Sequence, residues 1–361
     1  MTRTTEPIRL LVVSDSLPER NGVGAYYVDL IGQLEHEGFA CTLLCPSSNR
    51  GWIHLPLPGD ATQRIYLPSP MRVARIIRQT DPHVIVVATP GPFGMMGARW
   101  SRRLNVPLLV GFHTHYAGVT DVYRNVVFRN LSRAYFQYVG RLLFKTATQV
   151  LGNSDDMLTL ARSLGGQNVE RIGTLLPGPV LNTPLKPHSG RIQQLLFAGR
   201  LAPEKRVLHV LETAEAMPSI DFAIAGDGPL RADVDSAAQR LDNVTALGWL
   251  SREQLMQQMD GCDALVMPST LESFGTVALE AMARARLALV TDTSGIVNWP
   301  ELRDQLTVFS LDTPLHSVLQ SLKDGSSAAI QAQAEASAAA ARQLNQTSLE
   351  HWIALLKRHA Q

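Results

Sequence analysis

Two carboxylates eight residues apart form the most informative chemical pattern in this sequence. Glu272 and Glu280 lie in PSTLESFGTVALEAM, residues 268–282, where a strand pattern ends, a turn rich in Ser and Thr follows, and a helix pattern begins near Gly275. The N-terminus of a helix presents unpaired N–H groups and a partial positive charge, which suit a phosphate or the hydroxyls of a sugar. Carboxylates accept hydrogen bonds from paired sugar hydroxyls. The spacing alone is equally typical of a capped helix with two solvated glutamates.

Two cations follow another predicted strand. In FAGRLAPEKR, residues 197–206, Arg200 and Lys205 bracket a turn that contains proline and leads into a helix pattern. They suit a pyrophosphate, because arginine offers a planar fork of donors and lysine a compact charge. Surface cations after a strand are common, so this motif indicates a phosphate site only in combination with others.

Two loops that contain glycine also follow strand patterns. AGDGPL, residues 225–230, allows a close backbone approach, which serves a ligand or a plain turn equally. PERNGVGAYY, residues 18–27, places Gly22 and Gly24 between the first strand and the first helix. No third glycine follows at the dinucleotide spacing, which disfavours a nicotinamide or flavin site and leaves a different ligand near Gly22 open.

Short apolar strands alternating with helical segments must position these residues. The strands are expected at 8–13, 40–45, 84–88, 107–112 and 149–151, and again at 194–198, 222–225, 244–247, 264–267 and 287–290. Continuously apolar strands, each followed by a helix, indicate a parallel sheet covered on both faces. Two such halves predict an α/β protein with two doubly wound domains.

Prolines and glycines mark the expected domain boundary. They are frequent in LPGPVLNTPLKPHSG, residues 176–190, where we expect a linker without regular structure. An N-terminal domain is then expected over 1–175 and a C-terminal domain over 191–340. The segment 341–361 is expected to be a docked helix, since Trp352 and its neighbours recur at helical spacing.

Length and composition fit a globular protein of two domains. Of the 361 residues 45% are hydrophobic, and no apolar run reaches the roughly 18 residues of a membrane span. The first apolar stretch is too short for a secretory signal. Cys41, Cys45 and Cys262 lack a Cys-x-x-Cys spacing, so we expect reduced thiols, a cytoplasmic location and no metal site.

The charge is unevenly distributed. Residues 61–150 hold 12 basic and 2 acidic residues, and a segment this basic usually faces something negative: anionic lipid, a phosphorylated acceptor or nucleic acid. Towards its C-terminal end, residues 122–145 have an apolar stripe at helical spacing and no acidic residue. The cations predicted to contact a membrane there are Arg124, Arg129, Arg133, Arg141 and Lys145. A helix packed on the core with a solvated basic face is the alternative, and nucleic acid is disfavoured because no recognition module accompanies the charge.

The motifs in their order resemble the glycosyltransferases of family 4. The resemblance runs through FAGRLAPEKR, AGDGPL, ALGWLSREQL, ALVMPSTLESFGTVALEAM and TDTSG, and is strongest over 193–295. It implies the GT-B fold, two facing Rossmann-like domains with a cleft between them. It also implies a retaining transfer of a hexose from a UDP- or GDP-sugar to a hydroxyl acceptor, without a cofactor.

The resemblance also implies roles for individual residues. Arg200 and Lys205 would contact the donor diphosphate, Glu280 the nucleotide ribose, and Glu272 the transferred sugar. The other donor-binding positions are Gly22, Gly199, Gly228, Ser273, Phe274, Gly275 and Thr276. His113, in VGFHTHY, matches an element that faces the acceptor and completes the catalytic set with Arg200, Lys205 and Glu272. The helix at Trp352 resembles one that crosses back onto the N-terminal domain.

The acceptor is expected to be a membrane lipid. The His113 element followed by the basic helix resembles glycolipid-forming members, including phosphatidylinositol mannosyltransferases and sulfolipid synthases, which implies diacylglycerol or a phospholipid headgroup at the inner face of the cytoplasmic membrane. Ala285, Leu287 and Ser294 depart from the family, which usually has Gly, Pro and Gly there. A soluble acceptor, an epimerase on the same fold, and a non-catalytic sugar-nucleotide-binding protein remain alternatives.

Overall fold

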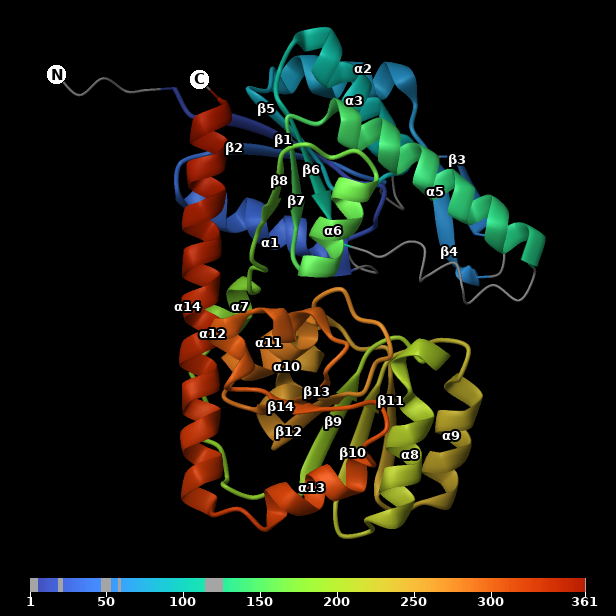
Figure 1. Ribbon diagram of the computed structural model, residues 1–361, viewed down its shortest axis with the longest axis vertical. Coiled ribbons are helices and arrows are strands. Elements are labelled where there is room, and N and C mark those ends of the chain that lie inside the picture. The colour runs from blue at the N-terminus through green and yellow to red at the C-terminus, as the bar shows by residue number, and fades with distance from the viewer. Residues whose placement is uncertain (1–5, 19–21, 47–52, 58–59, 114–125, 361) are drawn as a thin grey trace, which may run out of the picture. The chain divides into compact units, whose positions relative to one another are not determined.

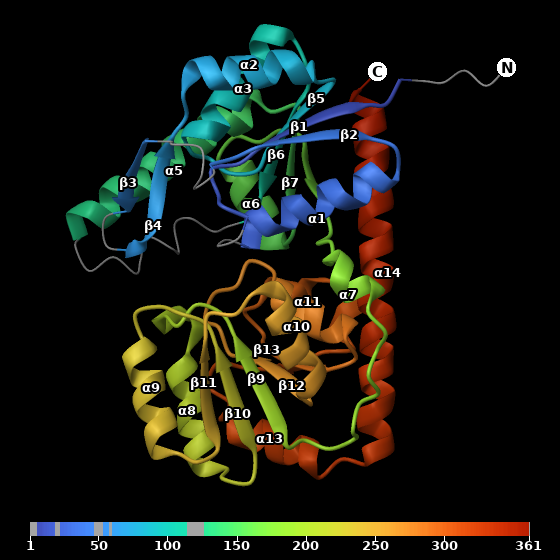
Figure 2. The ribbon, with the colours of Figure 1, turned by 180° about the vertical axis from the view of Figure 1, so that it is seen from behind.

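The computed structural model confirms an α/β protein with two parallel sheets of six strands each. It describes residues 6–18, 22–46, 53–57, 60–113 and 126–360. The chain divides into two compact units: unit 1 contains Met1–Leu175 with Gln346–Gln361, and unit 2 contains Leu176–Asn345 (Figures 1 and 2). None of the described helices holds an apolar stretch long enough to cross a membrane.

The sheet of unit 1 has the strand order β2-β1-β5-β6-β7-β8, and all neighbours are parallel. Its strands are β1 (Arg9–Val13), β2 (Ala40–Leu44), β5 (Val84–Val87), β6 (Leu108–Phe112), β7 (Gln149–Gly152) and β8 (Val169–Arg171). A separate antiparallel hairpin is formed by β3 (Ile53–Leu57) and β4 (Asp60–Leu67). The helices are α1 (Gly22–His36), α2 (Pro70–Thr80), α3 (Pro92–Leu104), α5 (Val126–Thr146) and α6 (Asp155–Ser163).

Alternate residues of the unit 1 strands point to opposite faces of the sheet, and each face has its own helical cover. Leu11 and Val13 of β1 belong to a core shared with α2, α3, α5 and α6. Leu10 and Val12 belong to a core shared with α1 and with the C-terminal part of the long helix α14 (Ser327–His359). The two-sided burial explains why these strands are apolar without alternation.

Unit 2 repeats this plan with the strand order β11-β10-β9-β12-β13-β14, again all parallel. The strands are β9 (Gln194–Ala198), β10 (Asp221–Ala225), β11 (Val244–Gly248), β12 (Ala264–Met267), β13 (Leu287–Thr291) and β14 (Thr307–Phe309). Its helical elements are α7 (Gly178–Asn182), η1 (Pro203–Lys205), α8 (Val207–Ala216), α9 (Arg231–Arg240), α10 (Arg252–Gly261), α11 (Thr276–Ala283), η2 (Gly295–Asn298), α12 (Pro300–Arg303), α13 (Leu315–Lys323) and the first part of α14.

Each sheet has one point at which the strand order reverses. In unit 1 the chain builds outward from β1 to β2 and then continues on the other side of β1 with β5; in unit 2 the same happens between β9 and β12. Open parallel sheets bind ligands outside the carboxyl ends of the strands at such a switch point. The fold therefore marks one candidate position for a ligand in each unit.

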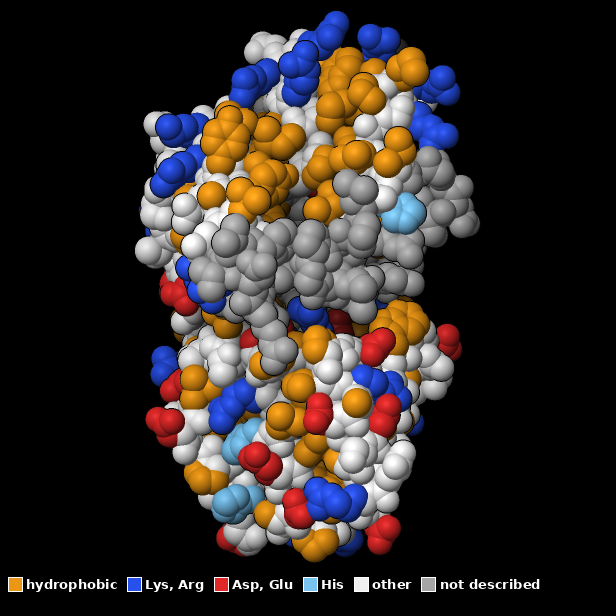
Figure 3. Space-filling view, turned by 90° about the vertical axis from the view of Figure 1, so that its right-hand side faces the viewer, with side chains coloured by type: hydrophobic (Ala, Val, Ile, Leu, Met, Phe, Trp, Pro, Cys, Tyr) orange, Lys and Arg blue, Asp and Glu red, His pale blue; other side chains and the backbone are white. Residues whose placement is uncertain are grey.

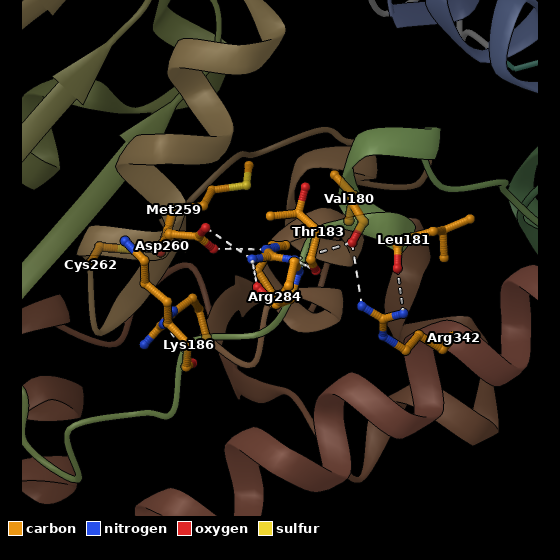
Figure 4. Close-up of polar contacts among 11 residues, drawn as sticks. Val180, Leu181, Thr183, Lys186, Met259, Asp260, Cys262, Arg284 and Arg342 are labelled. Atoms are coloured by element: carbon orange, nitrogen blue, oxygen red, sulfur yellow. Dashed lines mark hydrogen bonds and ion pairs between the residues drawn. The ribbon is translucent and has the colours of Figure 1, made fainter.

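The segment 176–190 differs from the expected linker, because it is part of unit 2 and contains the helix α7. The fully buried Arg284 holds it in place (Figure 4). Its guanidinium pairs with both carboxylate oxygens of Asp260 at 2.7 and 2.9 Å. It also donates to the backbone carbonyl oxygens of Val180, Thr183 and Pro184 at 3.3, 2.7 and 2.8 Å. Proline removes backbone donors here, but the carbonyl oxygens remain and are satisfied by arginine.

The chain returns to unit 1 through the second part of α14. The expected C-terminal helix is the end of this one continuous helix, and its residues join unit 1 from Gln346 onward. Trp352 is fully buried there, and its indole Nε1 donates a hydrogen bond of 2.8 Å to the hydroxyl of Tyr26 on α1. A buried tryptophan with a satisfied N–H anchors the helix by both area and direction.

Candidate functional site

The switch point of unit 2 brings together the residues that follow β9 and β12. After β9 the backbone of Gly199 and Leu201 is joined to the AGDGPL turn: Gly199 donates to the carbonyl of Ala225 at 3.0 Å. A Cβ at Gly226 would lie 1.8 Å from the Gly199 oxygen, and one at Gly228 would lie 2.6 Å from the Leu201 oxygen. Both glycines have positive φ, so their first requirement is this close packing of two loops. Gly228 was predicted to bind the donor, but the packing of the two loops already requires glycine at this position.

Lys205 and Glu272 are neighbours although 67 positions separate them in sequence. Lys205 ends η1 after β9, Glu272 lies in the turn after β12, and the lysine Nζ forms an ion pair with the glutamate Oε2. Both side chains are about four-fifths buried. Arg200 lies 3.8 Å from Glu204, and the main chain of Glu204 accepts a hydrogen bond of 2.8 Å from the N–H of Thr270. Two cations and one carboxylate predicted from separate motifs therefore share one edge of the sheet.

The helix α11 begins at this edge. Its N-cap is Gly275, with φ at 104°, and a Cβ there would lie 2.6 Å from the terminal methyl of Met267. No side chain among the described residues accepts a hydrogen bond from the N–H groups of Gly275, Thr276 or Val277, so this end remains available to an anion. Glycine is needed because the chain turns in a left-handed conformation against β12.

The predicted donor-binding residues differ in what they expose. Phe274 is buried and packs edge-to-face on Trp299, with ring centroids 6.2 Å apart, so only its backbone lies at the edge. Ser273, Thr276 and Glu280 are half-buried, and Glu280 lies on the second turn of α11. Glu272 and Glu280 are thus separated by one loop and one helical turn, as their spacing indicated.

A third loop, after β13, supports the Glu272 turn from behind. Its Ser294 pairs with Glu272 in a parallel bridge, and the N–H of Gly295 donates to the Glu272 carbonyl at 2.9 Å. Thr291 donates to the carbonyl of Ser269 at 2.6 Å, while the buried hydroxyl of Ser269 has no partner among the described residues. Ser294, one of the departures from the family pattern, is accommodated within this group of hydroxyls.

The other two departures lie in the core. Ala285 follows α11 with φ at 57°, a left-handed conformation that favours the glycine usual in the family. Leu287 begins β13 and is fully buried. Both changes concern packing and backbone strain behind the site.

The switch point of unit 1 has a residue that the sequence interpretation missed. Asp15 follows β1, and its carboxylate accepts hydrogen bonds from the N–H groups of Gly91, Phe93 and Gly94 at 3.0, 2.7 and 3.1 Å, and from the hydroxyl of Thr89 at 2.8 Å. Burial raises the pKa of this carboxyl to about 6, against the lowering effect of these hydrogen bonds. Asp15 therefore caps α3 from another strand. Its position directly after the first apolar strand was the available indication.

His113 lies next to this position, after β6. Its Nε2 is 3.0 Å from the hydroxyl of Tyr27, and Gly111 is required beside them, because a Cβ there would lie 1.8 Å from that hydroxyl. Burial lowers the pKa of His113 to about 4, so its imidazole is neutral at pH 7. Gly22 is the exposed first residue of α1, and a Cβ there would meet nothing within 4 Å.

The basic helix α5 begins at Val126, so the predicted cation Arg124 lies outside the described residues. Its apolar stripe is exposed: Leu131, Tyr135 and Tyr138 are 66, 44 and 68% accessible. Arg141 and Lys145 are exposed, whereas Arg129 and Arg133 are half-buried. Figure 3 shows hydrophobic side chains gathered over unit 1 and bordered by Lys and Arg. The helix packs on the core through Val139, Leu143 and Phe144, as the alternative expected, and leaves Leu131, Tyr135 and Tyr138 of its predicted stripe exposed.

Among the described residues, no three His, Cys, Asp or Glu side chains lie together as metal ligands would.

Two family models match the chain, one in each half. The model described as Glycosyltransferase Family 4 matches residues 20–178, and that described as Glycosyl transferases group 1 matches residues 186–299. A GDP-mannose-dependent alpha-mannosyltransferase of Mycobacterium tuberculosis is 26% identical over 308 residues, 80% of either chain. One of the same name from Mycolicibacterium smegmatis is 27% identical over 315 residues, again 80% of each.

Solved structures share the fold at lower identity. A sucrose-phosphate synthase from Thermosynechococcus elongatus superimposes with a TM-score of 0.71 at 17% identity, covering 98% of both chains. HepE of Anabaena, in complex with UDP and glucose, gives a TM-score of 0.67 at 17% identity, over 96% of this chain and 99% of that one. These likenesses show that both six-stranded units belong to the GT-B architecture.

Proposed function

The chain belongs to the glycosyltransferases of family 4, and we propose that it transfers a hexose from a nucleotide diphosphate sugar to a hydroxyl of a membrane lipid, with retention of configuration. The observation that supports this most is the group at the unit 2 switch point: Arg200, Lys205 and Glu272 at one sheet edge, beside the uncapped start of α11. These are the groups that a diphosphate and a sugar require.

In the proposed reaction the bond between the sugar carbon and the diphosphate oxygen breaks as the acceptor oxygen forms its bond to the same carbon. The sugar acquires oxocarbenium character and the diphosphate gains negative charge. Arg200, Lys205 and the N–H groups at the start of α11 stabilise that charge, and the acceptor proton passes to a departing phosphate oxygen. Lys205 exchanges its partner Glu272 for the diphosphate, which leaves that carboxylate to accept hydrogen bonds from the sugar.

The first donor to test is GDP-mannose. The two mycobacterial relatives that cover four-fifths of this chain are both named for GDP-mannose. The HepE structure holds UDP and glucose, so UDP-glucose is the second donor to test.

The exposed stripe of α5 supports the lipid acceptor. Leu131, Tyr135 and Tyr138 lie on one helical face and are 66, 44 and 68% accessible in the part of the chain that the structure describes. An amphipathic helix with aromatic residues and flanking cations binds an anionic interface, where each nearby cation contributes about 1 kcal/mol. We propose that the enzyme works at the inner face of the cytoplasmic membrane and that the neutral imidazole of His113 positions the acceptor hydroxyl. We also propose that no metal ion takes part, so that turnover with the right donor should be unchanged in excess EDTA.

A transfer assay with radiolabelled sugar tests the proposal. Purified protein is offered GDP-mannose and UDP-glucose, each with and without extracted membrane lipids, and the label is followed into the organic phase. Label in that phase only with lipid, and none with the Arg200→Ala/Lys205→Ala variant, is the expected result. Label that stays in the nucleotide or in free sugar under every condition would overturn the lipid-acceptor proposal.

A further inference from the structure

An open groove lies between α3 and α5 of unit 1 and begins at Pro92, beside the N–H groups of α3 that Asp15 binds. It has a volume of about 840 Å³. Cations from α3 and apolar side chains from both helices line it: Met95, Met96, Arg99, Arg102, Arg103 and Leu142. Volumes of about 300–1,000 Å³ are typical of sites for small organic ligands.

The three arginines are exposed and face no carboxylate. Arg99, Arg102 and Arg103 form no ion pair within the described part of the chain, and α2, α3 and the described part of α5 contain no acidic residue. The guanidinium of Arg103 stacks on the ring of Trp100 at 5.1 Å, which restricts its orientation before any ligand binds. Three arginines without a counter-charge, one of them oriented by Trp100, suit an anion with several oxygens, above all a phosphate.

The remainder of the groove is apolar. Met95 and Met96 are half-buried beside Leu142, so they expose part of their side chains to the groove. Methionine adapts its shape to varied apolar partners. The ligand that matches this lining has an anionic head and an aliphatic chain.

We propose that this groove binds one anionic phospholipid of the bilayer, with its phosphate on Arg99, Arg102 and Arg103 and an acyl chain along Met95, Met96 and Leu142. The proposal rests on the proposed membrane role and adds a defined lipid site to it. The bound lipid anchors the protein and is not the acceptor. Pro92 begins α3 at the carboxyl edge of the sheet, where His113 lies, and Arg102 lies about 15 Å farther along the helix.

Calorimetric titration with short-chain lipids below their micelle concentration separates this site from general membrane contact. Dihexanoyl phosphatidylglycerol should bind saturably, and dibutanoyl phosphatidylglycerol more weakly by about fourfold for each methylene that the groove buries. The variant Arg99→Gln/Arg102→Gln should weaken dihexanoyl binding at least about tenfold. The matched control Arg72→Gln/Arg75→Gln, which removes the same charge at the same spacing from exposed positions of α2, should leave it unchanged.

Each alternative result overturns the proposal. Glycerol 3-phosphate binding as tightly as the lipid would mean a site for soluble phosphate esters. If both double arginine variants weaken lipid binding equally, the lipid is attracted by the overall positive charge and not bound in the groove. If lipid binding does not saturate, the groove is not a binding site. Removing the α5 stripe, by Leu131→Ser/Tyr138→Ser, tests the proposed membrane contact of α5 separately: it should weaken binding to anionic vesicles and leave the binding of the monomeric lipid unchanged.

Discussion

The two switch points have the same topology and opposite chemistry. In unit 1 the helix after the switch, α3, has its N-terminal N–H groups occupied by the internal carboxylate of Asp15. In unit 2 the corresponding helix, α11, begins at Gly275 without a side-chain acceptor among the described residues, and the turn before it holds Glu272, which pairs with Lys205. One helix start is satisfied by the protein, and the other is left for a ligand.

The difference shows how one fold repeated in a chain can separate two tasks. A buried carboxylate at the switch point excludes a second anion by charge and by occupying the donors. In the proposed function the anionic donor binds to unit 2, while unit 1 offers the neutral, aromatic surroundings of His113 and Tyr27. Topology marks both positions, and we expect Asp15 to keep phosphate away from the one in unit 1 because it occupies the N–H groups there.

The largest effect is expected from the cations of unit 2. Lys205→Ala or Arg200→Ala removes a charge that stabilises the leaving diphosphate, which should lower kcat about 10²- to 10³-fold. Arg200→Ala should change stability little, because its contact with Glu204 is long at 3.8 Å. Lys205→Ala should also lower the stability, because it leaves the largely buried carboxylate of Glu272 without its ion-pair partner. Steady-state kinetics and thermal unfolding measure the two quantities, with Arg240→Ala, an exposed cation of the same unit, as control. Full turnover in both variants would contradict the assignment.

The corresponding experiment in unit 1 removes the carboxylate of Asp15. Asp15→Ala leaves three buried N–H groups and the Thr89 hydroxyl without their acceptor, which should lower the free energy of unfolding by about 2–3 kcal/mol at pH 7. The KM for the donor should not change. Denaturant unfolding of the whole chain gives the first value, and Ser251→Ala, which removes the cap of α10 in unit 2, is a matched control with an expected loss of about 1 kcal/mol. A raised donor KM in Asp15→Ala alone would mean that unit 1 also binds the donor.

The sequence predicts the residues at the unit 2 switch point better than Asp15 at the unit 1 switch point. Spacing and residue type predicted that one edge of the unit 2 sheet holds several charged residues, because these lie in local motifs that follow strands. The residues are Arg200, Lys205, Glu272 and Glu280. Asp15 acts on a helix 76–79 positions away, and such a contact exists only once β1 and β5 pair. The helix α3 was expected only in general, as the helix after the strand at 84–88, because its glycines and proline obscure the helical pattern of PFGMMGARWSRRL.

Apolar strands with two buried faces were predicted to within one or two residues, since burial determines their composition. The three-residue edge strands β8 and β14 and the hairpin β3–β4 were missed, because they are too short or too exposed for such a pattern. Proline predicted an irregular segment at 176–190, whereas the distant Arg284 orders it. Composition predicts an element where the element's own burial dominates, and fails where a remote side chain does.

A smaller effect is expected from pH. His113 has a pKa lowered to about 4 by burial, so the unfolded chain binds its proton more tightly, and stability is lost as the pH falls from 6.5 towards 4. Between pH 7 and pH 5 this amounts to about 2 kcal/mol. The raised pKa of Asp15 has the opposite effect and stabilises the folded protein as the pH falls from about 6. The two effects nearly cancel in the wild type, so the change in stability with pH must be compared between wild type and a His113 variant. His113→Asn should gain about 2 kcal/mol relative to wild type between pH 7 and pH 5. Parallel curves would mean that His113 titrates normally in the folded protein.

The smallest effect tests whether the aromatic residues beside His113 are scaffold or site. Tyr26→Phe removes the hydroxyl that accepts the Trp352 indole hydrogen bond, which should cost about 1 kcal/mol of stability and leave kcat unchanged. Tyr27→Phe removes instead the hydroxyl that contacts His113, so it should lower kcat as well. Unfolding and transfer rates measured on both variants separate the roles of two adjacent tyrosines on one helix. If both variants keep full turnover, His113 acts without its tyrosine partner, and the chemical contrast between the two switch points rests on Asp15 alone.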